Sequence, residues 1–289
     1  MKNFLKTQIL FFVLILLLPG CVKLALQFTP SLIPNFTETI FEECDSELAK
    51  NAIPANLKLL EGLLKNDSDN KKILTALAMG FSGYSMLFVE SEDTERASGL
   101  YLRARDYGIR ALGDKGPALI NPEVPREDLQ NILKTIGKEG LKPLIWTTVS
   151  WNAWINLNLD KPMALAQLGL TQACLERIIE IDAHYMHGLP YILMGISLAA
   201  RPPMFGGNPE QAKLFFEKAM ALSQNKFFFA QYYFARYYAV RVQDKRLFLR
   251  LVDDIIKGRP QDLRDVCLIN TVTQHKVREL AKKMDELFI

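Results

Sequence analysis

Hydrophobic positions recur three and four residues apart along most of the chain, which is the spacing of one face of an α-helix. The first two sets lie at 57–64 and 73–79, separated by a run of Asn, Asp and Ser. The same pattern predicts further helices at 96–112, 127–137, 141–158, 162–181, 186–199, 209–222, 227–242, 244–257 and 262–288. No segment alternates with a period of two, and no Asn-Gly pair indicates a hairpin. We therefore predict an all-α fold of antiparallel helix hairpins, stacked as a tetratricopeptide-like repeat bundle.

Repetition within the helices supports the stack. Residues 176–185 resemble residues 217–226 at an offset of 41, whereas a tetratricopeptide repeat has a period of about 34. The long loop 201–209 accounts for the difference. Small, large and small residues that let helices approach occur in the triplets Ala212-Phe216-Ala219 and Ala55-Leu59-Gly62, and more loosely in Ala104-Gly108-Ala111. Such stacks bind partners or ligands on their concave face.

The beginning of the chain has the composition of an export signal. Two lysines precede an apolar run at 9–18, which is about half the length that spans a bilayer. Gly20-Cys21 resembles the lipid-attachment site of bacterial lipoproteins, although Pro19 stands where a small or β-branched residue is usual. We expect a signal peptide at 1–20, a lipidated tether at 21–40 and a single helical-repeat domain at 41–289. Ordinary cleavage and an uncleaved anchor are the alternatives.

Charge and cysteine content limit which classes of partner and which cellular compartments fit the protein. The formal net charge is +3, and it falls to +1 without the two signal lysines, so nothing favours nucleic-acid binding. Lipidation of Cys21 leaves Cys44, Cys174 and Cys267, an odd number without a CxxC motif. Cys174 and Cys267 lie among apolar residues, and we expect buried free thiols there. A disulfide that involves Cys44 is the alternative in an oxidising compartment.

Three segments carry a family resemblance. The loop and helix start at 201–213 (RPPMFGGNPEQAK), the tryptophan-rich helix at 146–156 and the ending at 286–288 resemble the TatT lipoproteins, the T component associated with TRAP transporters. The resemblance covers about residues 40–289. It implies a lipoprotein on the periplasmic side of a bacterial membrane, with the outer membrane favoured over the inner. It also implies a homotrimer with openings into a central pore, a soluble TRAP-type binding protein as partner, and a small organic ligand, for which a hydrophobic molecule is one candidate.

Two segments are candidates for the ligand site. The three tryptophans Trp146, Trp151 and Trp154 lie within nine positions, interleaved with Asn152 and Asn156. Indoles and amides together suit a wall that holds an apolar ligand and orients its polar end, although core packing explains the indoles as well. Met204 and Phe205 lie on the long loop, where they would border a cleft or a subunit contact. The following glycines Gly206-Gly207 have a backbone explanation as a tight turn before a helix.

The remaining motifs favour no chemistry. No GxSxG, Walker, HExxH or dinucleotide sequence is present, so we expect a non-enzymatic protein without a cofactor. His184 and His187 are three apart but lack a third ligand, and no metal site is expected. The aromatic block at 227–238 is interpreted as core first and as a trimer interface second. The alternative function is a scaffold lipoprotein of the outer membrane with no small-molecule ligand.

Overall fold

The computed structural model describes residues 31–121 and 123–288. The predicted signal peptide, Pro19 and the lipidation residue Cys21 therefore lie outside the described residues. Within the described ranges the chain forms helices and no strand. The predicted all-α fold of stacked helix hairpins is confirmed.

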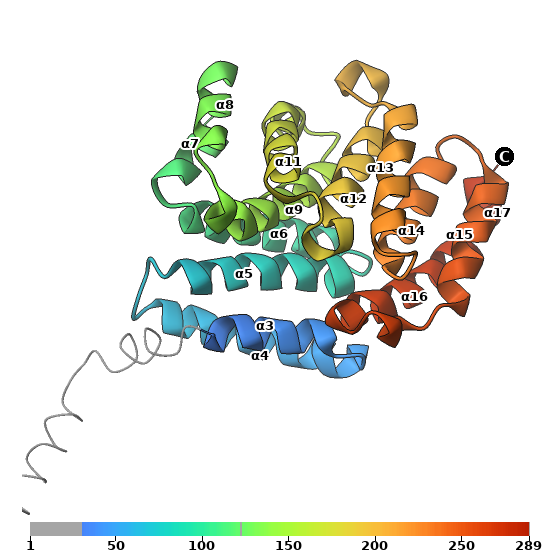
Figure 1. Ribbon diagram of the computed structural model, residues 1–289, viewed down its shortest axis with the longest axis horizontal. Helices are drawn as coiled ribbons and strands as arrows, with labels where there is room; N and C mark the ends of the chain where they lie inside the picture. The colour runs from blue at the N-terminus through green and yellow to red at the C-terminus, as the bar shows by residue number, and fades with distance from the viewer. Residues whose placement is uncertain (1–30, 122, 289) are drawn as a thin grey trace, which may run out of the picture.

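The helices follow one another with short connections (Figure 1). The first group comprises α3 (Leu32–Glu42), α4 (Ser46–Leu64), α5 (Lys71–Tyr84), the π-helical segment η1 (Ser85–Val89) and α6 (Thr94–Ala111). The middle group comprises η2 (Gly113–Lys115), α7 (Gly116–Ile120), α8 (Arg126–Lys134), η3 (Lys138–Gly140), α9 (Leu141–Asn156), α10 (Pro162–Leu165), α11 (Leu168–Asp182) and α12 (Tyr185–Ala200). The last group comprises η4 (Pro203–Phe205), α13 (Pro209–Leu222), α14 (Phe228–Tyr233), the π-helical segment η5 (Phe234–Ala239), α15 (Lys245–Lys257), η6 (Pro260–Asp262), η7 (Arg264–Val266), α16 (Cys267–Lys282) and α17 (Met284–Leu287).

Local sequence explains where the main helices begin. A side-chain oxygen accepts a backbone N–H at the start of α4, α5, α6, α13 and α15, from Asp45, Asn70, Asp93, Asn208 and Asp244 respectively. Each such cap satisfies an N–H group that has no partner inside its helix. At α5, α6, α13 and α15 the capped start lies within two residues of the predicted start, whereas α4 begins at Ser46, well before the periodic set at 57–64.

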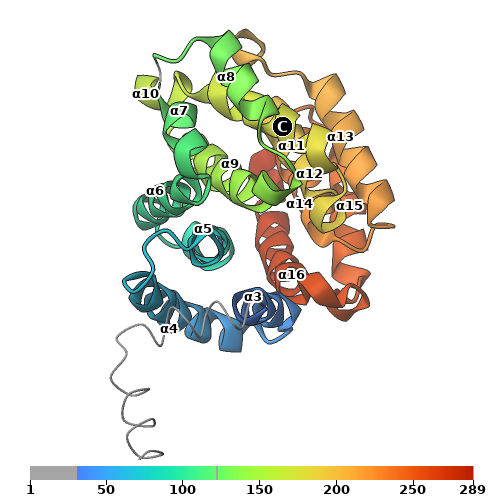
Figure 2. The same ribbon diagram turned by 60° about the vertical axis from the view of Figure 1, so that its left-hand side comes forward.

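The stack closes on itself. Helix α5 packs against α4, α6 and α9, and the series continues through α11, α12 and α13 to α14 and α15. Helix α16 then returns to contact α3 and α4, so a helix near the end of the described chain lies beside its first helices (Figures 1 and 2). A disulfide between Cys44 and Cys267 joins them across 223 residues of sequence. The expectation of a free thiol at Cys267 is therefore wrong, and the alternative of a bond to Cys44 holds.

The proposed tether also differs from the structure. Residues 32–42 form helix α3, which packs against α5 and α16 and buries Ile33 and Phe41. Pro34 lies in the first turn of this helix, where a missing N–H costs no intrahelical bond. The part of the expected tether from residue 32 onward is thus part of the folded body.

The three small-residue triplets have different outcomes. Ala212, Phe216 and Ala219 are fully buried where α13 packs on α12. The loosely matching triplet beginning at Ala104 is buried too, and a Cβ at Gly108 would clash with Thr147 Oγ1 of α9. The triplet at 55–62 is exposed instead. Helix α4 lies at the edge of the stack and buries only the face toward α5, α3 and α16.

One helix among the described residues is long and apolar enough to cross a membrane. It is the continuous helix Lys71–Val89, formed by α5 and η1, and 61% of its most apolar window is buried inside the protein. Its apolar composition is accounted for by its central place in the bundle, between α4, α6 and α9. The predicted core role of the aromatic block is confirmed as well, because Phe227 to Ala235 are buried without a break.

Candidate functional site

A cavity of about 100 Å³ lies between α9, α12, η1 and the α14–η5 helix. Helix α9 contributes Asn152 and Asn156 to its wall, α12 contributes Ser197, and the α14–η5 helix contributes Tyr233 and Arg236. Polar side chains from three elements thus face one internal space, which we call the central cavity.

Both π-helical segments of the described chain border this cavity. η1 contributes Met86, and η5 contributes Arg236 and Tyr237. A π-helical turn inserts an extra residue into an α-helix, and such turns are frequent at functional sites. Each segment is followed by a short turn and an aspartate N-cap, Asp93 or Asp244. Two copies of the same local structure therefore border the central cavity.

Charged groups gather beside the central cavity. Tyr101 donates its hydroxyl proton to Glu90 Oε2 at 2.6 Å, Arg236 Nη1 donates to Tyr232 Oη at 3.2 Å, and Lys276 Nζ donates to the Met86 carbonyl oxygen at 2.5 Å. Among the described residues neither cation has an acidic group within 4.0 Å. Burial, with Glu90 nearby, raises the pKa of Tyr101 well above its ordinary value, so Tyr101 stays a donor.

Lys276 titrates abnormally in this cluster. Burial lowers its pKa, and Arg236 lowers it further, while Glu90 partly opposes the shift. The protein therefore holds a lysine where its charged form is disfavoured, which is typical of functional sites rather than of a surface.

Arg201 fixes the orientation of Asn152. Its guanidinium is 4% exposed and donates to Asn152 Oδ1 at 3.4 Å and to Gln172 Oε1 at 3.5 Å. Burial lowers the pKa of Arg201 to about 10. The Asn152 oxygen accepts from Arg201, so the amide nitrogen of Asn152 points to another partner. That nitrogen has no acceptor among the described residues. A buried donor without a partner costs about 1–3 kcal/mol, so this arrangement is expensive unless a ligand or water accepts the bond.

A much wider cleft of about 830 Å³ adjoins the central cavity. The two share Glu90, Arg236 and Tyr237 in their walls. The other walls of the cleft come from the first turns of α4, the end of η1, and α16 with α17. These three shared side chains separate the interior from a broad open surface.

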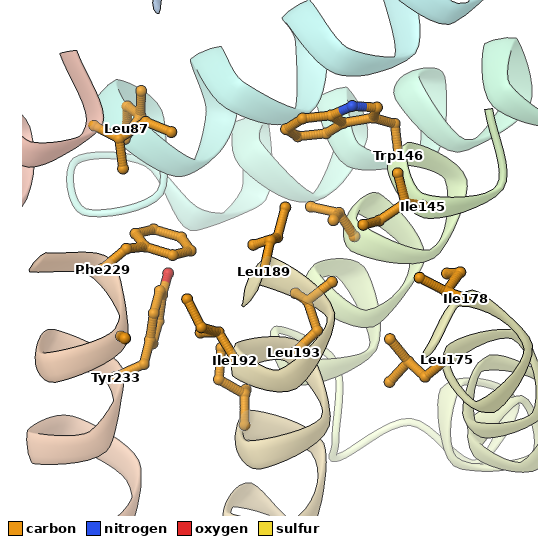
Figure 3. Packing of buried hydrophobic residues seen from close by; sticks show 14 of the residues in the cluster. Leu87, Ile145, Trp146, Leu175, Ile178, Leu189, Ile192, Leu193, Phe229 and Tyr233 are labelled. Carbon is orange, nitrogen blue, oxygen red and sulfur yellow. The ribbon is translucent and has the colours of Figure 1, made fainter. Parts of the chain in front are cut away.

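A small apolar cavity adjoins the central cavity. Its volume is about 30 Å³, and it shares Met86, Val149 and Leu193 with the central cavity. Figure 3 shows Leu87, Trp146, Leu189 and Phe229, from four different elements, around this region. Residues 186–188 before the regular part of α12 have positive φ, a strained conformation for Met186 and His187. Met186 itself lines this cavity.

The tryptophan helix divides between cavities and core. Trp146 borders the apolar cavity, and its Nε1 donates to Tyr185 Oη at 3.3 Å. Trp151 is fully buried, donates to Gln167 Oε1 at 2.6 Å, and packs with Trp154 in a separate core cluster with Tyr101. The two asparagines line the central cavity, but Trp151 and Trp154 do not. The five residues therefore do not form one wall.

Met204 and Phe205 lie apart from these residues. Met204 is 82% exposed and Phe205 41% exposed on the η4 turn, and neither lines the cavities described above. The glycines after them act on the backbone, as the sequence suggests. Gly206 has φ +84°, and a Cβ at Gly207 would clash with the Arg201 carbonyl oxygen. The loop thus passes close to the Arg201 backbone, whose carbonyl oxygen accepts from Arg241 Nη1 at 2.7 Å.

Other candidate residues have structural roles. His187 Nε2 lies 2.7 Å from Asp265 Oδ2, and no group of three potential metal ligands occurs among the described residues. Cys174 is a free, buried thiol, as expected, and burial raises its pKa to about 12. A thiol with that pKa is protonated and unreactive at neutral pH.

The sequence interpretation missed Glu90, Arg201, Arg236 and Lys276. One signal was available, because Arg236 is the single charge in the segment FFFAQYYFARYYAV at 227–240. A lone arginine in an apolar helix must either reach the surface or face a polar interior. The other three residues have ordinary sequence surroundings, and only the folded stack brings them together.

Comparisons with known proteins relate most of the chain to one family. The sequence model of the family described as TRAP transporter T-component matches residues 42–288. An uncharacterized protein of Treponema pallidum (strain Nichols) is 24% identical over 202 residues, which are 63% of this chain and 62% of that protein. The matched region thus spans less than two thirds of that relative.

Proposed function

Because the chain belongs to the TRAP transporter T-component family, we propose that it is a lipid-anchored periplasmic protein that works with the soluble binding protein of a TRAP transporter. In this proposal it binds a small organic ligand in the central cavity and passes it to or from that partner. No catalytic step is required, in keeping with an accessory transport component.

The unsatisfied donors of the central cavity carry the ligand proposal. Asn152 Nδ2 has no acceptor among the described residues, and Arg236 uses one of its five N–H donors, while the Tyr233 side chain also lines the cavity. A site with surplus donors favours a ligand whose polar end accepts hydrogen bonds. The adjoining apolar cavity beside Trp146 would take the apolar part. Trp146, Asn152 and Asn156 remain in this proposal, whereas Trp151 and Trp154 support the helix from behind.

The wide cleft gives the proposed partner a place to meet the ligand. It shares Glu90, Arg236 and Tyr237 with the central cavity, so movement of these side chains would join the two. A partner that covers the cleft would exclude bulk water during the exchange. Met204 and Phe205 are exposed apolar side chains on a fixed loop, and we propose them as subunit contacts in a homotrimer rather than as ligand contacts.

The disulfide supports export, because such bonds persist in oxidising compartments such as the periplasm. Cys44 and Cys267 are bonded, and we propose that Cys21 carries the lipid that holds the chain at the membrane, with the outer membrane favoured. Anchoring confines encounters with a soluble partner to a thin layer, which raises its effective concentration.

Affinity capture tests the partnership. Wild-type chain from detergent-solubilised membranes should recover the soluble binding protein encoded by its own TRAP system. A charge reversal in the cleft, Arg278→Glu, should reduce the recovery, whereas the exposed control Lys245→Glu should not. Recovery of outer-membrane structural proteins without any binding protein would favour the scaffold alternative.

A further inference from the structure

A separate pocket of about 340 Å³ lies at the opposite end of the long α5–η1 helix from the wide cleft. Lys71, Thr75 and Met79 of α5 line it, whereas Leu87 and Phe88 of η1 line the cleft. The helix Lys71–Val89 has 19 residues, so the two sites are separated by up to about 28 Å along its axis. It shares Trp146 with the small apolar cavity and no residue with the central cavity or the wide cleft.

The charge of this pocket is strongly positive. Four lysines line it and one acid, Glu139. The lysines are Lys71, Lys72, Lys115 and Lys142. Lys115 Nζ is held by the Thr135 carbonyl oxygen at 2.7 Å. The first turns of α5 and α9 also contribute to the wall, and the amino-terminal end of a helix carries partial positive charge. We call this site the lysine pocket.

The interior of the lysine pocket is apolar, with one donor at its base. Apolar side chains form much of the wall, among them Ile33, Pro34, Met79, Leu112, Ile136 and Trp146. Tyr185 Oη accepts the Trp146 Nε1 proton at 3.3 Å, which leaves the Tyr185 proton without an acceptor among the described residues. Cationic rim, apolar walls and a hydroxyl donor match a molecule that joins an anionic group to hydrocarbon. A free inorganic anion would leave the apolar walls unused.

The place of the pocket relative to the proposed anchor identifies the source of that molecule. Ile33 and Pro34 lie in the first turn of α3, and ten residues separate Cys21 from Leu32. A chain of that length spans at most about 36 Å. The mouth of the pocket is therefore within reach of the membrane surface to which a lipid on Cys21 would hold the chain.

We propose that the lysine pocket binds the phosphate headgroup of an anionic phospholipid in the membrane that carries the protein. The inference rests on the proposed lipidation of Cys21. Binding there would fix the orientation of the domain, with the α3 end toward the bilayer. The wide cleft at the other end of α5–η1 would then face away from the membrane, where a soluble partner approaches.

Native mass spectrometry of the full chain, purified from membranes in detergent, tests this. The added probes are dioleoylphosphatidylglycerol and the neutral-headgroup dioleoylphosphatidylcholine. We expect one phosphatidylglycerol per chain, preferred at least tenfold. The variant Lys71→Gln/Lys142→Gln should weaken this binding by about 25-fold, at roughly 1 kcal/mol per lysine. Glu139→Gln should strengthen it.

The matched control is Lys226→Gln/Lys245→Gln, which removes two exposed lysines outside the pocket and should behave as the wild type. Equal binding of both lipids, or an equal loss in the control, would overturn the proposal, as would complete displacement of the lipid by inorganic phosphate. The mass of the chain in the same spectra reports acylation of Cys21. An unacylated chain that still selects phosphatidylglycerol would refute the anchor and leave the pocket standing. Far-ultraviolet circular dichroism verifies that each variant is folded.

Discussion

The disulfide that closes the helix stack offers the sharpest stability prediction. Cys44 lies between α3 and α4, and Cys267 begins α16, 223 residues further along the chain. Substituting Cys44→Ser breaks the bond with little loss of packing, because Cys44 is exposed. For a loop of this length, the entropy of the unfolded chain predicts a loss of about 5 kcal/mol at 25 °C. Contacts of α16 with α3 and α4 persist without the bond, so this figure is an upper value.

A loss of that size is a large part of the roughly 5–15 kcal/mol that stabilises a typical domain. Urea denaturation followed by circular dichroism measures it. Cys44→Ser should lose about 3–5 kcal/mol, and reductant should bring the wild type to the same midpoint while leaving the variant unchanged. The control Cys174→Ala removes the free buried thiol and keeps the Cys44–Cys267 bond, so reductant should still lower its urea midpoint as it does in the wild type. The reasoning would be refuted if Cys44→Ser lost less than about 1 kcal/mol of stability and reductant did not change the urea midpoint of the wild type.

Three further predictions follow from contacts and charges. Gly108→Ala should destabilise the fold by about 1–3 kcal/mol, because the new Cβ clashes with Thr147. Gly99→Ala lies in open space on the same helix and should stabilise the fold by about 0.5–1 kcal/mol. The urea midpoints of the two variants measure the difference. Lys276→Met should be at least as stable as wild type at pH 7, because burial disfavours the charged form of the lysine. In urea titrations over pH, the stability of the wild type should rise relative to that of the variant only between the lowered pKa of Lys276 in the folded state and its pKa in the unfolded state. An equal difference in stability at every pH would contradict this. Trp151→Phe should lower stability, measured by thermal melting, without changing ligand binding. The reason is that Trp151 is fully buried and its Nε1 bonds only Gln167. Loss of ligand binding in a folded variant would show that Trp151 belongs to the ligand site.

The helices were predictable because their signals are local. Periodicity and N-caps such as Asp93 and Asn208 depend on neighbours within one turn, and the predicted helix at 209–222 coincides with α13. Helix α3 was missed because residues 21–40 were assigned to the lipidated tether, although Pro34 in the first turn is compatible with a helix start. The disulfide was only an open alternative, because the closure of the stack brings together residues from its two ends.

The candidate site was only partly predictable for a different reason. Helix α9 is surrounded by α5, α6, α11 and α12, so buried residues occur on all its sides and spacing does not tell core from cavity. Asn152 and Asn156 line the central cavity, whereas Trp151 and Trp154 do not. The two π-helical segments that place Met86 and Arg236 have no recognised sequence signature.

The central claim is that the donors of the central cavity bind a small organic ligand. Its most direct test is mass spectrometry of the small molecules that dissociate on denaturation of chain equilibrated with an extract of its own cells. Wild type and the control Lys245→Gln should release the same organic compound, and Arg236→Met should release at least tenfold less of it, the loss expected for a charge-assisted hydrogen bond of about 1.5–3 kcal/mol. An equal yield from a folded Arg236→Met protein would contradict the account.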